Sequence, residues 1–480
     1  MQRERKYLFC LVSAVMYCHC LLAQLSSEEK KTDTTIVSAN DVLYVVGDIE
    51  IIGNKRTKSQ IILREIPFKA GESYHFSVLI KKFEDARRQL MNTSLFHQVI
   101  VAAKNFEGNK IHVRVDVKER WYLFPVPYLK PVDRNLNQWI VEQKASLNRV
   151  NYGAKVLYNN ATGRNDKLRL LLVNGYTKQI SFNYDRLYID KKLKWGMNMG
   201  FAIGKNREVN YNTINDKQVF LKDNDAYLRS FTRAVFELTY RKAIKTRHSF
   251  GMAYLMERVK DTVLKLNPSY FNSPTSNSIR FPEIYYSMSY YDLDYIPYPT
   301  KGYAVQLSAG KRGLNKISNQ WSVSLKTSGS WYLATKTFLN LNLYASIRAP
   351  FKQPYISQRF LGYGDVFMQG YEYYVVDGVA GGYLKSTITR ELLNFNIRIP
   401  PIKKGKEAER IPVRIFGKVY GNAGYVHNPQ PGNNILSNQM LYSGGFGIDI
   451  LTFYDVTFKL EWTFNQLGQN GLFLHRKSIF

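Results

Sequence analysis

The segment that decides the fold class is LKWGMNMGFAI, which runs from Leu193 to Ile203. Its large apolar side chains occupy every second position, and Lys, Gly, Asn and Ala occupy the positions between them. Successive side chains of a β-strand point to opposite faces, so this pattern gives one apolar face and one small or polar face. The segment therefore predicts a strand that has an apolar environment on one side only.

The same period of two continues through most of the chain from about Tyr122 onward. A second clear case is VTFKLEWTF, residues Val456 to Phe464, and residues 180–184, 321–325 and 339–347 show shorter ones. Roughly sixteen strands over about 360 residues would leave about 22 residues for each strand and its connection. That spacing suits strands of about ten residues joined by loops of uneven length.

A soluble β-sandwich is the alternative, because it also buries alternate residues. Two features favour a barrel instead. The polar face often carries Gly and charged residues, which suits a wet lumen, and the pattern runs too long for one sandwich. A barrel also closes its own edges, as a membrane strand must. We therefore expect a mainly β protein in which residues 121–480 form a transmembrane antiparallel β-barrel of about 16 strands.

Residues 41–120 differ, because their pattern predicts a small mixed domain in the order β-α-α-β-β. Apolar residues four, three and four apart, from Leu79 to Leu90, place one apolar face on the longer helix, and Ser77 suits its N-cap. The predicted elements are a strand at Val46–Ile52, helices at Ser59–Glu65 and Ser77–Asn92, and strands at Gln98–Ala103 and Ile111–Val117. Residues 41–120 are thus expected to fold as one domain before the barrel.

The first residues have the layout of a secretory signal peptide. Basic residues lie within Met1–Lys6, an apolar stretch covers Tyr7–Leu22, and Ala23 ends a plausible cleavage site. We expect residues 1–23 to be the signal peptide and residues 24–40 to be a linker. A buried N-terminal helix and a lipoprotein signal are the alternatives.

The cysteines and the charge then exclude several kinds of protein. All three cysteines (Cys10, Cys18 and Cys20) lie in the predicted signal peptide, so no disulfide or thiolate metal site is expected after its removal. The net charge of +29 could suggest nucleic-acid binding, but 48 basic and 24 acidic residues are spread through residues 121–480 without a basic helix or tail. The seven histidines show no metal-ligand spacing, and no nucleophile or nucleotide motif occurs. We expect no enzyme activity, no cofactor, no metal and no nucleic-acid partner.

Taken together, these features resemble the BamA/TamA-type family of outer-membrane assembly and translocation proteins. That family has periplasmic POTRA modules, which are β-α-α-β-β domains, followed by a sixteen-stranded surface-antigen-type barrel. The stretches that carry the resemblance are GDIEIIGN at 47–54, SLF at 94–96, PTKG at 299–302, RFLGYGD at 359–365, MQGYEYYVVDG at 368–378 and the C-terminal run from Asn465 to His475, which is similar to Bacteroidetes-type members. The chain would be a short member with one POTRA.

The resemblance also implies site residues. Residues 359–378 would fold into the lumen, with a loop tip at Met368, Gln369, Gly370 and Tyr371 and supporting residues Arg359, Gly362, Gly364, Asp377 and Gly378. Taken singly, each of the glycines at 362, 364, 370 and 378 is better explained as an ordinary turn residue, and it is their joint spacing with the aromatic residues that points to a site. Candidate wall residues are Asn422 and Gly424, and Phe480 would be the aromatic C-terminal barrel signal, although Ser478 and Arg476 depart from its usual apolar pattern.

Two positions depart from the family pattern. Gln369 stands where the family's loop tip has Arg, which normally reaches an acidic residue on the inner wall, and Asn422 stands where an Asp is usual. Losing both charges together would avoid an unpaired buried charge. The departures put full assembly activity in doubt.

The family's function gives the leading hypothesis. The protein would lie in the bacterial outer membrane with its POTRA in the periplasm, and would insert or translocate proteins by strand-edge pairing and lateral seam opening, without nucleotide. Its partners would be unfolded outer-membrane or exported polypeptides, outer-membrane lipids including lipopolysaccharide, and accessory lipoproteins. The alternatives are a two-partner-type secretion pore for one exported protein and a passive porin or structural barrel, which Gln369 favours. The sequence does not name the client, the accessory subunits or the number of copies.

Overall fold

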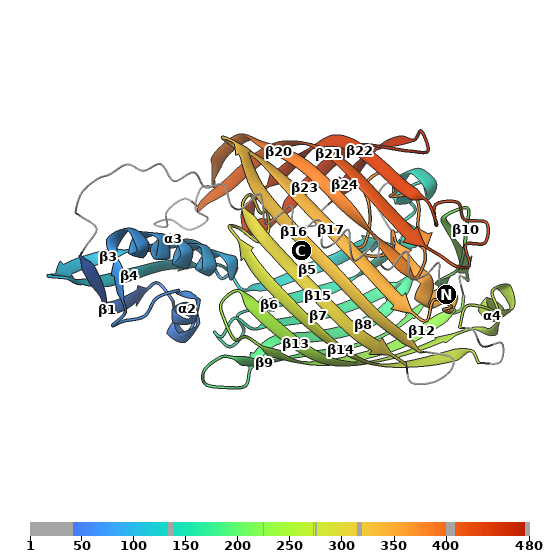
Figure 1. The fold of residues 1–480 in the computed structure, drawn as a ribbon. Helices are drawn as coiled ribbons and strands as arrows, with labels where there is room; N and C mark the ends of the chain where they lie inside the picture. Colours follow the sequence, from blue (N-terminus) through green and yellow to red (C-terminus); the bar gives the residue numbers. More distant parts are fainter. Residues whose placement is uncertain are drawn as a thin grey trace.

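The computed structural model describes residues 42–132, 138–223, 225–271, 273, 276–313, 319–399 and 409–475. A small αβ domain lies at one end of a large barrel (Figure 1). The predicted signal peptide (1–23), the predicted linker (24–40) and Phe480 lie outside the described residues.

The N-terminal domain has the predicted β-α-α-β-β order with one short strand added. Its elements are β1 (Leu43–Ile52), α2 (Ser59–Glu65), β2 (Ser73–His75), α3 (Phe76–Asn92), β3 (Phe96–Glu107) and β4 (Lys110–Glu119). The sheet order is β2-β1-β4-β3, so β3 is an edge strand. Strands β1 and β4 run parallel, and the other pairs are antiparallel.

The predicted apolar face of α3 forms the core of this domain. Leu79, Ala86 and Leu90 are fully buried in a cluster with Val113 and its neighbours on β4. Each large side chain buried there contributes about 1.5–3 kcal/mol of transfer free energy. The predicted N-cap at Ser77 is wrong: α3 begins one residue earlier and is preceded by His75, whose side chain makes no capping hydrogen bond.

The barrel is one sixteen-stranded sheet, as predicted. Its strands are β5 (Leu123–Pro131), β6 (Val150–Asn159), β7 (Lys167–Gly175), β8 (Thr177–Tyr188), β9 (Trp195–Asn206), β12 (Arg229–Tyr240), β13 (Thr246–Val259), β14 (Ser278–Leu293), β15 (Gly302–Arg312), β16 (Gln320–Ala334), β17 (Thr337–Ala349), β20 (Ala380–Ile399), β21 (Glu409–His427), β22 (Met440–Leu451), β23 (Thr457–Asn465) and β24 (Asn470–His475). Neighbouring strands pair in chain order, and within the described residues no pairing joins β5 to β24. We call this junction of β5 and β24 the seam.

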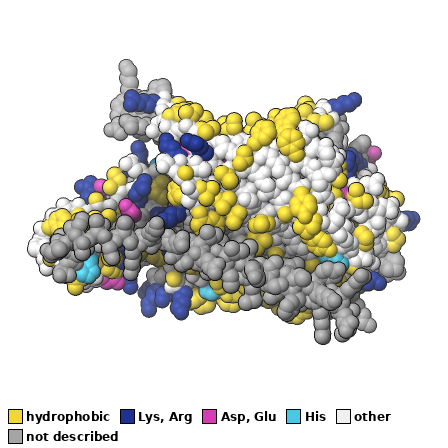
Figure 2. Space-filling view, turned by 45° about the horizontal axis from the view of Figure 1, so that its top comes forward, with side chains coloured by type: hydrophobic (Ala, Val, Ile, Leu, Met, Phe, Trp, Pro, Cys, Tyr) yellow, Lys and Arg dark blue, Asp and Glu magenta, His cyan; other side chains and the backbone are white. Residues whose placement is uncertain are grey.

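The alternation of side chains follows the sequence pattern in β23. Phe458, Leu460 and Trp462 are exposed on the outside, whereas Thr457 and Glu461 are almost fully buried on the inner face. Figure 2 shows hydrophobic side chains over the barrel wall, with Lys and Arg towards its ends. The outer face is therefore suited to lipid.

Leu193 does not fit the strand pattern from which the fold was predicted. It lies in the turn before β9 with a φ of 54°, and its side chain is buried in the core of the N-terminal domain. The Asp190 carboxylate accepts hydrogen bonds from the backbone N–H groups of Lys194 and Trp195, which fixes this turn. The apolar outer face of β9 therefore begins at Trp195.

The remaining elements belong to connections. Those beyond the barrel end opposite the N-terminal domain include the hairpin β10 (Glu208–Ile214) and β11 (Lys217–Lys222) and the helix α4 (Asp261–Leu266) (Figure 1). The others are η1 (Gln138–Glu142), η2 (Leu147–Arg149), α5 (Tyr355–Gln358), β18 (Arg359–Leu361), β19 (Val376–Asp377) and η3 (Phe453–Asp455). No helix in the described ranges is long and apolar enough to cross a membrane.

Candidate functional site: the lumen, the seam and the rim junction

The connection between β17 and β20 forms an inward loop, residues 350–379, whose tip contacts the inner wall. Asn465 Nδ2 donates a hydrogen bond of 2.7 Å to the Gly370 carbonyl, and the Tyr371 hydroxyl donates one of 3.0 Å to the Tyr442 carbonyl. Met368 is buried, and a Cβ on Gly424 would lie 3.2 Å from its sulfur. The structure thus brings together the predicted tip and the predicted wall position Gly424.

Gly370 is required at the tip for two reasons. Its φ of +89° lies in the left-handed region, and a Cβ there would lie 2.9 Å from Ser443 and 3.0 Å from Thr463. Residues other than glycine rarely adopt this backbone conformation. The tip can therefore reach the wall this closely only with glycine at position 370.

The tip residue Gln369 faces a buried network of charges. Its Nε2 lies 3.4 Å from Glu461 Oε1, and Glu461 is 1% exposed. The Lys418 ammonium lies 2.5 Å from both Glu461 and Asp449, and His475 Nε2 lies 3.3 Å from Glu461 and Glu372. The ammonium group that lies against Glu461, that of Lys418, comes from the wall rather than from the loop.

This arrangement differs from the expected joint loss of two charges. Asn422 donates a hydrogen bond to Ser443, and the tip residue Gln369 lies against an acidic side chain, that of Glu461. Sequence reasoning did not identify Lys418, Asp449 or Glu461 as site residues. The sequence does contain a signal that could have identified them. Charged residues occupy the inward positions of strands whose other face is apolar, as in the KLE run at 459–461.

The two ends of the inward loop are joined near Asp377. Strands β18 and β19 pair Arg359 with Asp377, and the Tyr363 hydroxyl donates a 2.7 Å hydrogen bond to the Asp377 carboxylate. Gly362 has a φ of +86°, and a Cβ on Gly378 would lie 2.4 Å from Val426. The predicted supports Arg359, Gly362, Asp377 and Gly378 therefore lie in one junction at the base of the loop, whereas Gly364 lies in open space.

The inward loop also contacts the last strand, at one side of the seam. The Phe367 ring stacks on His475 with 5.2 Å between centroids, and the Tyr373 ring lies 5.4 Å from that of Phe473. The Tyr374 hydroxyl donates a 2.9 Å hydrogen bond to Gln469. The position of β24 thus depends on the loop as well as on its pairing with β23.

Contacts also join connections at both ends of the barrel. At the outer end, the Asp216 carboxylate accepts hydrogen bonds from the Ile435 and Leu436 N–H groups, and its carbonyl accepts one from Val375. At the end near the N-terminal domain, the buried Tyr298 of the β14–β15 turn stacks on Phe416 at 4.4 Å. Between them lies a cavity of about 540 Å³ lined by lysines, aromatic rings and the tip of the loop.

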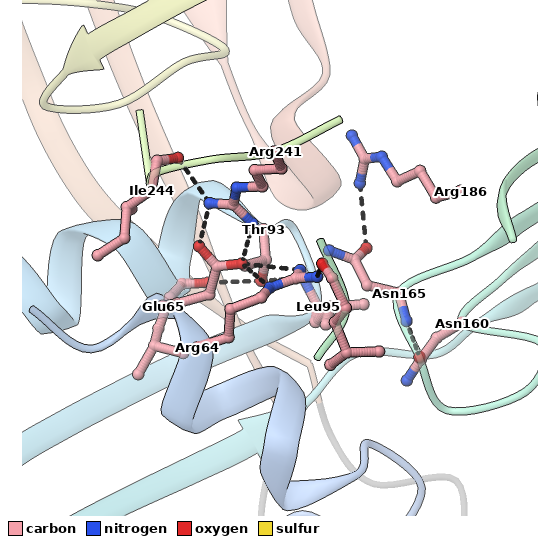
Figure 3. Close-up of polar contacts among 11 residues, drawn as sticks. Arg64, Glu65, Thr93, Leu95, Asn160, Asn165, Arg186, Arg241 and Ile244 are labelled. Carbon is pink, nitrogen blue, oxygen red and sulfur yellow. Dashed lines mark hydrogen bonds and ion pairs between the residues drawn. The ribbon is translucent and has the colours of Figure 1, made fainter. Parts of the chain in front are cut away.

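The N-terminal domain is joined to the barrel rim through Glu65 (Figure 3). Arg241, in the turn after β12, donates hydrogen bonds of 2.5 and 2.7 Å to the Glu65 carboxylate, and Arg64 lies 3.0 Å from it. Burial alone would raise the pKa of Glu65, but the charges and hydrogen bonds of Arg241, with the charge of Arg64, lower it to about 2. We call this contact the rim junction.

Other parts of the domain also contact the turns of the barrel. Asn92, at the end of α3, donates a hydrogen bond to the Leu293 carbonyl and accepts one from Ile296. The Arg56 guanidinium donates hydrogen bonds to the carbonyls of Asn160 and Ala161 in the β6–β7 turn. Within that turn, the Asn160 side-chain oxygen accepts a hydrogen bond from the Asn165 N–H. The domain is therefore fixed to turns from several parts of the rim.

The comparisons with known proteins agree with this architecture. Residues 44–120 match the POTRA family model, described as surface antigen variable number repeat. A region of 90 residues, 19% of the chain, is 31% identical to outer membrane protein assembly factor BamA of Neorickettsia risticii (strain Illinois), and the match spans 12% of that relative's length.

Solved structures of similar shape are also known. CdiB from Escherichia coli matches with a TM-score of 0.52 and 9% identity over 91% of this chain and 74% of that chain, which shows a shared fold. BamA from Haemophilus ducreyi lacking POTRA domains 1–3 matches with a TM-score of 0.47 and 16% identity, over 90% of this chain and 83% of that chain.

Proposed function

We propose that this chain is an outer-membrane protein of the BamA/TamA type, with one POTRA domain and a sixteen-stranded barrel, and that it assembles or translocates other polypeptides. The relative that a 90-residue region of this chain resembles is named as an assembly factor. Because the match spans 12% of that relative, the activity itself is a proposal about this chain.

The first working surface is the free edge of β3 in the POTRA domain. This strand has twelve residues and lies at the edge of its sheet, and residues 102–107 are exposed. An exposed edge offers unpaired backbone N–H and C=O groups, which bind any extended polypeptide by strand addition. Such binding selects an unfolded client by its conformation rather than by its sequence.

The second working surface is the seam, and it is the single observation that carries the proposal. Each of the other neighbouring strands of the barrel is paired with the next, whereas no pairing joins β5 to β24 in the described residues. A client strand could add to either edge while its outer face meets lipid. Outer-membrane lipids, including lipopolysaccharide, would contact the apolar face of the barrel, and accessory lipoproteins would contact the POTRA domain.

Depletion of the protein followed by proteomics of the outer membrane tests this function. If the protein assembles other barrels, many barrel proteins are lost together when it is depleted. An unchanged outer-membrane proteome and exported proteome would contradict both assembly and translocation.

A secretion pore for one exported protein is the second candidate, and the contact of the β10–β11 turn with residues 435 and 436, here called the outer cap, favours it. The Asp216 carboxylate in that turn accepts hydrogen bonds from Ile435 and Leu436, and none of these bonds belongs to the pairing of the barrel strands. In this case depletion would remove one exported protein and leave the other barrels at their normal levels. A passive porin is the third candidate, and its depletion would leave both the outer-membrane proteome and the exported proteome unchanged.

A further inference from the structure

A second contact between the POTRA domain and the barrel crosses the seam. Arg120, which follows β4, donates hydrogen bonds of 2.7 and 3.1 Å to the two carboxylate oxygens of Asp455 in the β22–β23 turn. The next residue, Trp121, donates its backbone N–H to the Tyr454 hydroxyl at 3.0 Å. The Tyr454 ring meets the Phe124 ring of β5 with 5.2 Å between centroids. We call this group of residues, Arg120, Trp121, Phe124, Tyr454 and Asp455, the latch.

The ion pair at the centre of the latch is largely buried and specific in geometry. The side chains of Arg120 and Asp455 are 8% and 14% exposed, and Tyr295 donates a further hydrogen bond to Asp455. Burial opposes the charge of Arg120, but the ion pair with Asp455 outweighs it and raises the pKa of Arg120. A bidentate Arg–carboxylate pair of this kind fixes orientation as well as distance.

The turn that presents the latch residues has an uncommon backbone. Tyr454 and Asp455 have φ values of 55° and 66°, in the left-handed region that residues other than glycine seldom adopt. Strained backbone of this kind persists only where surrounding contacts hold it. Loss of the contact with Arg120 would therefore allow the turn to relax, and with it the start of β23.

The latch also contacts the first residues of β3, the strand whose edge would bind a client. Arg120 Nε donates a 2.8 Å hydrogen bond to the Phe96 carbonyl. His97 is the extra residue of a β-bulge, and its ring lies 5.2 Å from the Tyr454 ring. One cluster of side chains thus joins the client edge of the POTRA domain to both sides of the seam.

We propose that the latch couples client pairing at β3 to opening of the seam. A strand that adds to β3 would reorder the bulge at His97 and the carbonyl of Phe96, which position the Tyr454 ring and the Arg120 guanidinium. Release of Asp455 would then free the β22–β23 turn to move β23 and β24 away from β5. This inference rests on the proposed function, because it assigns a regulatory role to the same edge and the same seam.

The rim junction provides a matched control. Glu65 and Arg241 form a buried ion pair between the same two parts of the molecule, but Arg241 follows β12, and the contacts of this pair involve neither β5 nor β22–β24. A change that acts only by loosening the POTRA domain from the barrel would affect both contacts in the same way. A change that acts on the seam would affect the latch alone.

The test measures the distance across the seam in the full chain in lipid nanodiscs. Spin labels are placed at Leu129 on β5 and Leu472 on β24, which are both exposed, after Cys10, Cys18 and Cys20 are replaced. We expect Asp455→Asn and Tyr454→Phe to broaden the distance distribution and shift it to longer values, and Glu65→Gln to leave it unchanged. Heat-modifiable mobility on gels confirms that each variant contains a folded barrel.

The coupling is tested by adding a ten-residue peptide of alternating Val and Thr with terminal lysines, whose binding is followed by fluorescence anisotropy. Bound peptide is expected to increase the long-distance population in the unaltered chain and to have no further effect in Asp455→Asn. Two results would overturn the proposal: a seam distance in Asp455→Asn identical to that of the unaltered chain, or peptide binding without a change in the seam. A different outcome would contradict the proposed function and not the latch. In that outcome, depletion leaves the outer-membrane and exported proteomes unchanged while the seam distance responds as expected.

Discussion

At the scale of single residues, the lumen contains a buried cluster in which Lys418 lies between two carboxylates. Lys418 lies 2.5 Å from Glu461 and from Asp449, and all three side chains are nearly inaccessible. Removing one partner of a buried ion pair leaves an uncompensated charge, which typically destabilises by about 3–5 kcal/mol. The neutral tip residue Gln369 is compatible with this wall because the wall supplies its own cation.

This account predicts the effect of Lys418→Met. The substitution leaves Asp449 and Glu461 with one fewer positive charge, so we expect the barrel to lose about 3–5 kcal/mol of stability. Adding Gln369→Arg, which places a guanidinium within reach of Glu461, should recover part of that loss. Unfolding followed by heat-modifiable mobility in urea measures both, and a double variant no more stable than Lys418→Met would contradict the account.

Gly370 allows a prediction with an internal control. Gly370→Ala introduces both a left-handed alanine and a Cβ only 2.9 Å from Ser443, whereas Gly364→Ala introduces a left-handed alanine in open space. The backbone strain alone costs about 1–2 kcal/mol in each variant. We expect Gly370→Ala to make the inward loop sensitive to protease and Gly364→Ala to leave it protected. Equal cleavage of the two variants would show that the tip does not pack on the wall.

At the scale of elements, the rim junction gives a prediction about pH. Glu65 has a pKa of about 2 in the folded chain and an ordinary value of 4.5, so its charge stabilises docking fully above pH 4.5. The stabilisation, roughly 3 kcal/mol, is lost progressively as the pH falls from 4.5 towards 2. We expect labels on the POTRA domain and on the β12–β13 turn to separate over this range.

The same experiment has a simple control. In Glu65→Gln the side chain has no charge to lose, so the pH dependence between 4.5 and 2 should disappear. If the POTRA domain of Glu65→Gln still separated from the barrel over that range, a group other than Glu65 would be responsible for the pH dependence.

The elements also show how far the sequence could predict this structure. The alternation in Val456–Phe464 predicts the inner and outer faces of β23, and the spacing from Leu79 to Leu90 predicts the buried face of α3, because local geometry fixes both periods. The positions of Leu193 and Tyr298 could not be predicted from the sequence. Each side chain extends from a barrel turn and packs against a part of the chain that is distant in sequence. The resemblance pointed to Gly424, which lies against Met368, but not to Lys418, Asp449 or Glu461.

At the scale of the whole molecule, the contact of the β10–β11 turn with residues 435 and 436 gives a prediction about conductance. The outer cap depends on the Asp216 carboxylate, which accepts hydrogen bonds from Ile435 and Leu436. Asp216→Ala removes these acceptors and should cost about 1–3 kcal/mol, because the two buried N–H groups lose their partner. We expect larger and more frequent open events in planar bilayers, while unchanged conductance would show that other contacts hold the cap.

The central claim is that the edge of β3 and the seam bind client polypeptides. Photocrosslinking in living cells tests this directly, with a photoreactive amino acid at Ala102 on β3, at Leu474 on β24 or at Phe458 on the outer face of β23. The account predicts that newly made outer-membrane or exported polypeptides crosslink at Ala102 and Leu474, and not at Phe458. Crosslinking at Ala102 and Leu474 no greater than at Phe458 would contradict it.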